Sequence, residues 1–254
     1  MQRRATDLKG YAIGARDGEI GSIEDLLFDD ADWTVRYLVA DTGTWLPGRK
    51  VLVSPAALGS VNPDAKNVSV SLTREQVRNC PDFDKGNFSR ERQTAYHDYF
   101  GWPYYWIGEA VWAPGVLPGR APEERTNEQT RQQNAPGAEQ TPGNEPHIHS
   151  VNEIVGHYVE AKDGAIGHVE DFILDDESWE IRYLIVDTRN WLPGRKVLVA
   201  PEWIEMVNWI DSKLHIDLSR DAIESGPEYS SDAFNRDYEQ RLHRHYNRRG
   251  YWSA

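Results

Sequence analysis

The stretch DGEIGSIEDLLFDDADWTVRYLVADTGTWLPGRKVLVSP, residues 17–55, returns as DGAIGHVEDFILDDESWEIRYLIVDTRNWLPGRKVLVAP at residues 163–201. The two stretches align without a gap at an offset of 146 residues, and 24 of their 39 positions are identical. Shared composition does not produce such identity, so the chain contains one structural unit twice. Weaker similarity at the same offset, as between Trp106 and Trp252, extends the repeat over most of the 254 residues.

Each repeat has the alternation that is typical of β-strands. Every second position is β-branched or aromatic, as at Val35, Tyr37, Val39, Ile181, Tyr183 and Ile185. Asp-Gly and Leu-Pro-Gly turn signals bound these segments at the same places in both repeats. Several short strands at close spacing predict a small antiparallel β-barrel in each repeat, so the fold class is all-β with short helices.

A helical segment is predicted after each barrel. Thr73 and Gln76 have the spacing of a capping box, and Ser219 with Asp221 is a looser version. Beyond them, each repeat has a stripe of mostly aromatic residues at intervals of four: Phe88, Arg92, Tyr96 and Phe100, then Phe234, Tyr238, Leu242 and Tyr246. We expect these helices to dock on the barrels.

The chain therefore divides into five predicted segments. These are a first barrel at 1–84, an aromatic helical extension at 85–112, a linker at 113–150, a second barrel at 151–230, and a basic aromatic helical extension at 231–254. The linker is rich in Pro, Gly, Gln, Asn and Glu, and it has too few large apolar residues to offset its ordering entropy. We predict that it is disordered.

Charge and cysteine content narrow the function classes. The net charge is −13, and residues 236–254 alone are basic, with five arginines against two acidic residues. A nucleic-acid groove would need clustered Lys and Arg on a folded face. Cys80 is the only cysteine, so one chain can form neither a disulfide nor a thiolate metal cage. Because no apolar run approaches about 18 residues, we expect a cytoplasmic protein without a membrane span.

The ordered motifs resemble a known family. Asp-Gly-x-Ile-Gly, then Arg-Tyr-Leu, then Trp-Leu-Pro-Gly-Arg-Lys-Val-Leu-Val, closed by Cys-Pro-Asp-Phe or Gly-Pro-Glu-Tyr, look like a PRC-barrel domain over about 7–84 and 153–230. The resemblance implies a compact six-stranded antiparallel barrel, as in the photosynthetic reaction centre H subunit and in ribosome-maturation proteins. Those relatives use the barrel to hold partners. From its sequence, we expect this chain to have neither the membrane helix of the former nor the separate N-terminal domain of the latter.

Acidic and histidine clusters do not form a convincing catalytic or metal site. Glu24 and Asp25, like Glu170 and Asp171, are neighbours on a strand, so their side chains point to opposite faces and cannot share a substrate. We predict a structural hydrogen-bonding role for them. The acidic turns at 29–32 and 175–177 lack the spacing of a calcium loop. His147 and His149 have no third ligand nearby. We predict no enzyme activity, no metal and no cofactor.

Two features are candidates for binding. The Trp-Leu-Pro-Gly-Arg-Lys turn combines an aromatic with a basic pair, a mixture common at contact hot spots, at Trp45, Arg49, Lys50, Trp191, Arg195 and Lys196. Its structural alternative is a hairpin whose tryptophan caps the core. The aromatic residues after each barrel, among them Trp102, Trp106 and Trp252, are predicted to pack between domains or subunits. Stacking on nucleic acid or lying on an anionic membrane is the alternative.

These observations predict a non-enzymatic tandem scaffold or adaptor that assembles an unknown protein partner. We expect the two barrels to pair within one chain or in a homodimer. The rival hypothesis is an RNA- or ribosome-associated protein that uses the basic C-terminal tail.

Overall fold

The protein folds into two compact units that do not coincide with the two repeats. The computed structural model describes residues 1–84, 88–106, 147–188 and 194–253. We call Lys9–Ile148 with Glu177–Trp179 the N-terminal unit. The C-terminal unit consists of Met1–Leu8, His149–Asp176 and Glu180–Ala254.

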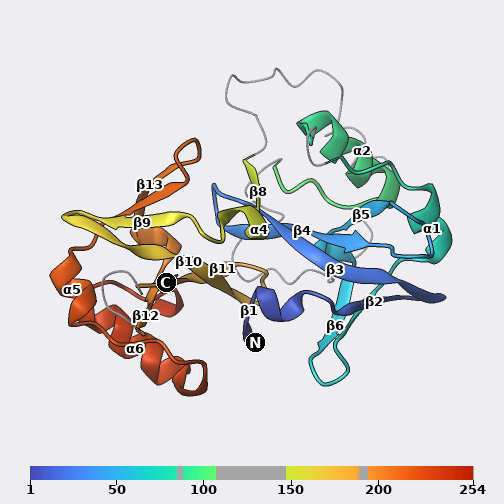
Figure 1. The fold of residues 1–254 in the computed structure, drawn as a ribbon. Helices are drawn as coiled ribbons and strands as arrows, with labels where there is room; N and C mark the ends of the chain where they lie inside the picture. The colour runs from blue at the N-terminus through green and yellow to red at the C-terminus, as the bar shows by residue number, and fades with distance from the viewer. Residues whose placement is uncertain (85–87, 107–146, 189–193, 254) are drawn as a thin grey trace. The chain divides into compact units, whose positions relative to one another are not determined.

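The N-terminal unit is built on one sheet, in the strand order β5-β4-β3-β2-β7-β6 (Figure 1). Its strands are β2 (Ala12–Ala15), β3 (Gly18–Asp29), β4 (Thr34–Asp41), β5 (Lys50–Val53), β6 (Leu58–Asn62) and β7 (Asn67–Val70). Two helices follow, α1 (Arg74–Asn79) and α2 (Arg90–Phe100). Thr73 caps α1 in the predicted capping box with Gln76.

The C-terminal unit repeats this order as β12-β11-β10-β9-β14-β13. Its strands are β9 (Tyr158–Ala161), β10 (Gly164–Asp175), β11 (Ile181–Asp187), β12 (Lys196–Val199), β13 (Ile204–Asn208) and β14 (Lys213–Ile216). Its helices are α4 (Val151–Ile154), α5 (Arg220–Glu224) and α6 (Arg236–His245). The prediction that both repeats form the same β unit is confirmed, with one difference. One pairing in each sheet, β2 with β7 and β14 with β9, is parallel rather than antiparallel.

Each unit has its own core. Apolar side chains at equivalent positions of the two repeats are almost fully buried: Ile13, Ile23, Leu26, Leu38 and Leu52, with Val159, Val169, Phe172, Leu184 and Leu198 as counterparts. The largest fully buried side chains are Tyr37, Tyr96 and Tyr183. Burial of this apolar surface is the main favourable term for the fold.

One glycine in each repeat lets the long strand change partners. A Cβ atom on Gly21 would lie 2.0 Å from the carbonyl oxygen of Asp41, and one on Gly167 would lie 1.9 Å from that of Asp187. Both glycines also have positive φ angles, 134° and 159°. The backbones of β3 and β4, or β10 and β11, can approach this closely only without a side chain.

Gly21→Ala should therefore destabilise the N-terminal unit by about 3 kcal/mol or more, because a backbone atom blocks the new methyl group. Urea unfolding monitored by circular dichroism measures the loss. The matched control is Gly43→Ala, at φ 57° with no atom within 4 Å of the added Cβ. It should cost only about 1 kcal/mol. Equal losses in the two variants would contradict this explanation.

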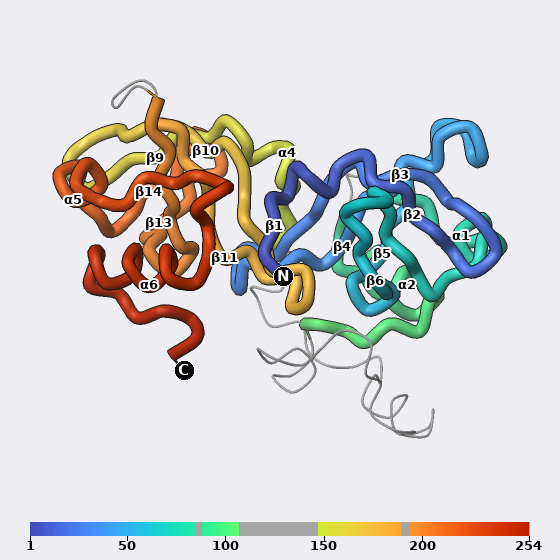
Figure 2. Tube along the Cα trace, turned by 90° about the horizontal axis from the view of Figure 1, so that it is seen from below, coloured from blue at the N-terminus to red at the C-terminus, as the bar shows by residue number. Residues whose placement is uncertain are grey.

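The first strand of each repeat pairs with the long strand of the other repeat. β1 (Gln2–Arg4) runs antiparallel to β10, with Gln2 opposite Asp175 and Arg4 opposite Ile173. At the equivalent place, 146 residues later, β8 (Ile148–Ser150) pairs with β3. Figure 2 shows the N-terminal end of the chain beside the strands of the second repeat. The two repeats thus exchange their first strands.

This exchange changes two of the predicted boundaries. Residues 1–8, assigned by sequence to the first barrel, belong to the C-terminal unit. The last residues of the predicted linker, 148–150, form β8 and are ordered by pairing with β3. A three-residue strand carries too little alternation to be recognised in sequence. Residues 113–146 of the predicted linker lie outside the described residues.

Within the described parts of the chain, no helix has the length and apolar character needed to cross a membrane.

Candidate functional site

The turn that carries Trp45 is organised by a buried threonine. The Thr42 hydroxyl lies 2.7 Å from the carbonyl oxygens of both Leu46 and Arg49, so its single hydrogen holds the two ends of the turn together. Thr188 in the second repeat donates in the same way to Arg195 O at 2.8 Å. The turn is therefore a fixed platform rather than a loose loop.

The arginines of this turn, Arg49 and Arg195, form hydrogen bonds within their own units. The Arg49 guanidinium donates to the carbonyl oxygens of Arg78 and Cys80, at the C-terminal end of α1. Arg195 donates likewise to the carbonyl oxygens of Glu224 and Gly226. These bonds satisfy the carbonyls that a helix end leaves without partners.

The neighbouring lysines are also paired. Lys50 binds Glu24 at 2.6 Å, and Lys196 binds Glu170 at 2.6 Å. Four of the six turn residues predicted as contacts thus already have structural partners, and only the tryptophans remain. Of these, Trp191 lies outside the described residues.

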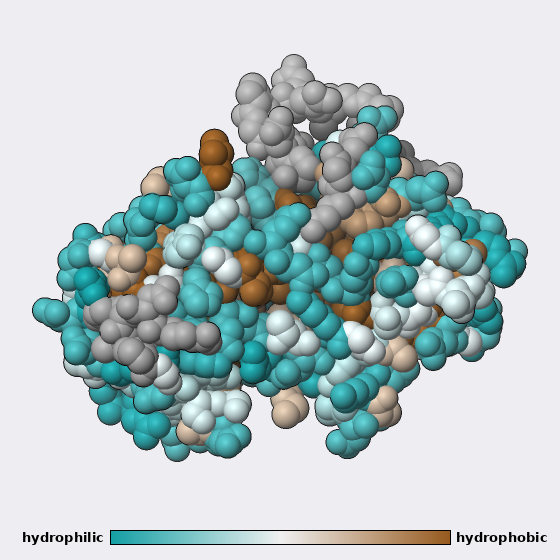
Figure 3. All heavy atoms as spheres, in the orientation of Figure 1, coloured by the Kyte–Doolittle hydropathy of each residue, from teal (hydrophilic) through white to brown (hydrophobic). Residues whose placement is uncertain are grey.

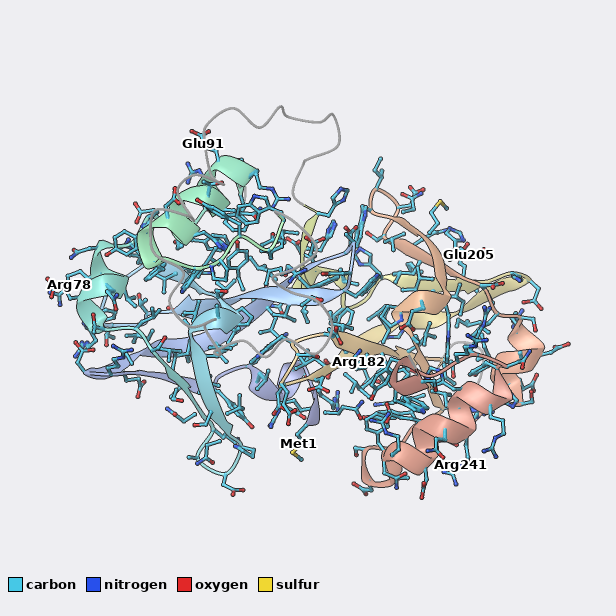
Figure 4. The ribbon with its side chains drawn as sticks, turned by 180° about the vertical axis from the view of Figure 1, so that it is seen from behind. Met1, Arg78, Glu91, Arg182, Glu205 and Arg241 are labelled. Atoms are coloured by element: carbon cyan, nitrogen blue, oxygen red, sulfur yellow. The ribbon has the colours of Figure 1, made fainter. Side chains whose placement is uncertain are left out.

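Trp45 is half-buried, and two arginines of α1 lie near its ring. The guanidinium carbon of Arg74 lies 4.6 Å from the Trp45 ring centroid, and that of Arg78 lies 5.9 Å away. Figure 4 shows Arg78 on α1 at the edge of this unit. Beside Trp45 is an open hollow of about 470 Å³, lined by Glu19, Gly21, Ser22, Asp41, Thr42, Gly43, Thr44, Trp45 and Arg74. We call Trp45, Arg74 and Arg78 the tryptophan clamp.

The second repeat does not contain this clamp in full. Arg74 has the counterpart Arg220, but Arg78 has the counterpart Glu224. A second hollow of about 570 Å³ adjoins Arg74 and Arg78 and is lined also by Asp17, Glu75 and Asn79. The two-arginine arrangement is therefore particular to the N-terminal unit.

A buried histidine holds the aromatic extension of each unit. Because a carbonyl oxygen only accepts, His97 Nδ1 donates to Pro103 O at 2.8 Å, and His97 Nε2 accepts from the Tyr37 hydroxyl at 2.8 Å. The rings of Trp102, Tyr104, Tyr105 and Trp106 have centroids 4.8 to 5.9 Å from the His97 ring. The predicted docking of α2 on the sheet is thus made through His97 and Tyr96.

The C-terminal unit repeats this centre with one change. His243 contacts Arg249 O at 2.9 Å and the Tyr183 hydroxyl at 2.9 Å. Its neighbour Glu239, 1% exposed, accepts from Tyr183 and Tyr251 and binds Arg236. The N-terminal unit has Gln93 in place of Glu239. A buried carboxylate is thus satisfied in one unit and replaced by an amide in the other.

The tryptophans predicted to cover an interface contact the histidine of their own unit. Trp106 lies 4.8 Å from His97 and Trp252 lies 4.9 Å from His243, measured between ring centroids. Each ring is also covered by an arginine at 4.5 Å, Arg90 or Arg236. Trp102 is 8% exposed and stacks on Phe100 at 4.3 Å. These aromatics therefore close the cores of their own units.

Asp171 and the acidic turns have structural partners. Asp171 is fully buried and accepts from Arg4 Nε at 2.7 Å. In the turn between β3 and β4, Asp32 pairs with Arg36, and Asp30 lies 3.3 Å from His147 Nδ1. His149, the other histidine of the predicted pair, stacks on Trp209 with ring centroids 3.5 Å apart. Within the described ranges, no three His, Cys, Asp or Glu side chains gather where they could hold a metal ion.

The sequence matches the family model of the PRC-barrel domain at residues 1–77 and again at 146–223. The chain belongs to the PRC-barrel family. A search of curated proteins finds no match. The PRC-barrel match covers more than half of the chain, and it includes the exchanged strands β1 and β8 as well as the turns that carry Trp45, Arg49 and Arg195. It ends before α2 and α6, so the histidine centres lie partly outside it.

The histidine centres could have been found from the repeat itself. Tyr37 with Tyr183, and His97 with His243, are identical pairs at the 146-residue offset, although their surroundings diverge. Arg74 also has an identical counterpart in Arg220, but Arg78 does not, and the approach of both arginines to Trp45 depends on how α1 packs against the turn.

The buried histidine should make the N-terminal unit sensitive to acid. Burial, acting mainly by desolvation, lowers the pKa of His97 to about 4 from an ordinary value near 6.5. Below pH 6.5 the unfolded chain takes up the proton and the folded unit does not, so stability falls between pH 6.5 and 4. The loss amounts to roughly 3 kcal/mol at the lower limit.

Urea unfolding at a series of pH values tests this. His97→Gln should flatten the pH dependence in that window. His245→Gln, at an exposed histidine of α6, is the matched control and should leave the slope as it is in the wild type. A slope that is the same in all three proteins would show that His97 does not carry the effect.

Proposed function

We propose that this chain is a non-enzymatic scaffold that assembles protein partners, and that the tryptophan clamp is a contact site for one of them. The observation that carries the proposal is the half-buried Trp45 ring with two guanidinium groups near it, beside an open hollow of about 470 Å³. Tryptophan and arginine are the residue types most enriched at the energetic centres of protein interfaces. Hydrogen bonds from Thr42 hold the turn that carries Trp45, and α1 carries the two arginines.

The charges around the clamp favour a protein segment over a polyphosphate. Arg74 and Arg78 attract carboxylates, but Glu19 and Asp41 line the hollow beside Trp45 together with Arg74 and would repel a chain of phosphates. A partner segment that carries both signs of charge, with an apolar or planar group to cover Trp45, matches this surface. Pairing of complementary charges would fix the orientation of the partner more than it would add affinity.

The C-terminal unit presents a different surface that also suits contact. At the tip of the β13–β14 hairpin, Ile210 is 95% exposed and Met206 in β13 is 53% exposed. Figure 3 shows hydrophobic atoms standing out at this tip. The first repeat has Asp64 and Ser60 at the equivalent positions. The two units thus present unlike surfaces, as a scaffold for two different partners requires.

The rival RNA-binding hypothesis receives less support from the basic tail. Arg248 is paired with Asp217, and Arg236 with Glu239. Arg241 is exposed on the outer face of α6, as Figure 4 shows. The other arginines of the tail belong to a chain whose net charge is −13, which disfavours binding to an anionic partner. Tight binding to RNA would need several phosphate contacts on one face.

Affinity capture with the full chain tests the proposal. Proteins retained from the native source are identified by mass, and the affinity of each is then measured against Trp45→Ala and Arg74→Ala. Loss of a hot-spot residue costs about 2 kcal/mol or more, which is roughly a 30-fold weakening. The matched control is Arg220→Ala, the counterpart of Arg74 in the second repeat.

Two outcomes would contradict the proposal. One is a partner that binds wild type, Trp45→Ala and Arg74→Ala equally well. The other is binding to single-stranded RNA that weakens steeply with salt and is abolished by Arg241→Ala with Arg244→Ala, which would favour the RNA-associated alternative.

A further inference from the structure

The C-terminal unit contains a binding groove that is filled by residues 1–8. β1 forms the backbone ladder with β10, and Ala5 N continues it by donating to Phe172 O at 2.9 Å. The side chains of Ala5 and Leu8 are fully buried in this unit. The segment therefore completes a sheet and a core that the second repeat leaves open.

The floor of the groove is a carboxylate that depends on the bound strand. Asp171 is fully buried, and it accepts from Arg4 Nε at 2.7 Å, from Thr6 N at 3.2 Å and from the Thr6 hydroxyl. Its fourth donor is the amide of Phe172 at 2.8 Å. Removing the strand would take away three of the four donors to Asp171 and would expose its carboxylate, together with the apolar surface that Ala5 and Leu8 cover, to water.

The rim of the groove matches the charge of the strand. Arg3 donates to Asp176, with Nε at 2.7 Å, and Arg4 Nη2 lies 3.6 Å from Glu170. Gln2 donates to Glu239 at 2.9 Å. The groove thus selects an extended segment in which two basic residues are followed by a hydroxyl side chain two positions later.

The strand belongs to the C-terminal unit but is joined in sequence to the other folding unit. The chain leaves the C-terminal unit at Leu8 and enters the N-terminal unit at Lys9. The equivalent segment of the second repeat, β8, likewise pairs with β3 in the sheet of the first repeat. Each repeat therefore lacks its own first strand and takes one that is attached elsewhere. A groove of this kind does not distinguish a strand of its own chain from the same strand of another.

We propose that the groove beside β10 is a strand-acceptor site that takes residues 1–8 of a second copy of this chain, so that two chains form a dimer with exchanged N-terminal strands. Attachment within one chain gives an effective concentration in the millimolar range, so dilute protein keeps its own strand. Exchange between chains takes over when pairing within the chain is weakened. It is slow, because each exchange must first break the β1 ladder and the hydrogen bonds from Arg4 and Thr6 to Asp171.

Complementary charge reversal in the full chain tests the proposal. Arg4→Glu places two carboxylates together, and Asp171→Lys places two cations together, so each single variant disfavours pairing within its own chain. When the two variants are mixed, both grooves can be filled with opposite charges by strands from the partner. Native mass spectrometry should show an equimolar heterodimer in the mixture and monomers in each separate variant.

The double variant Arg4→Glu with Asp171→Lys is the matched control, since it restores opposite charges within one chain and should stay monomeric. Folding of each variant is checked by circular dichroism. Two folded variants that remain monomers after mixing would overturn the proposal.

A cross-link test covers the case in which a single variant does not fold. Gln2→Cys with Asp175→Cys joins two positions that face each other in the ladder, in a chain that also carries Cys80→Ser. After the protein is unfolded and refolded, oxidation at low concentration should give disulfides within the chain. Refolding near millimolar concentration should give a growing share of disulfide-linked dimers. Complete oxidation with monomers alone at every concentration would overturn the proposal.

Discussion

A fully buried carboxylate, Asp171, is the constraint on which the arrangement of the chain depends. Removing a carboxylate from water costs several kcal/mol unless donors surround it. Three of the four donors to Asp171 come from Arg4 and Thr6, which lie at the other end of the sequence. The C-terminal unit therefore cannot complete its core from the second repeat alone. The same short contact region also buries Ala5 and Leu8, so apolar burial and charge pairing act together.

Local rules were enough to predict the repeated β unit, and long-range pairing was not. The alternation around Tyr37 and Tyr183, the turns and the capping box at Thr73 depend on neighbours in sequence, and the structure has each of them. β1 and β8 are three residues long, and β1 pairs across about 170 residues, so nothing near them in sequence indicates the partner. A structural role was predicted for Asp171 because neighbouring side chains on a strand, such as Glu170 and Asp171, point to opposite faces. Its actual partners depend on the exchanged strand.

The candidate site could be predicted in part, because composition identifies contact residues but not their partners. Composition singled out the turn from Trp45 to Lys50 as a candidate contact site. In the structure, Arg49 and Lys50 have partners within the N-terminal unit. Trp45 instead lies near Arg74 and Arg78 of α1. The repeats have also diverged where they face solvent, as at Arg78 and Glu224. Such divergence on a shared framework is what two different binding surfaces would require.

Native-state hydrogen exchange of the full chain tests the central claim, that the N-terminal strand is part of the C-terminal unit. The amides of Ala5 and Thr6 donate to Phe172 O and to Asp171. They should open with the same free energy as the amides of β10 and β11, and respond to urea in the same way. Little protection at Ala5 and Thr6, or an opening free energy that follows β2 and β3 of the N-terminal unit instead, would contradict the account.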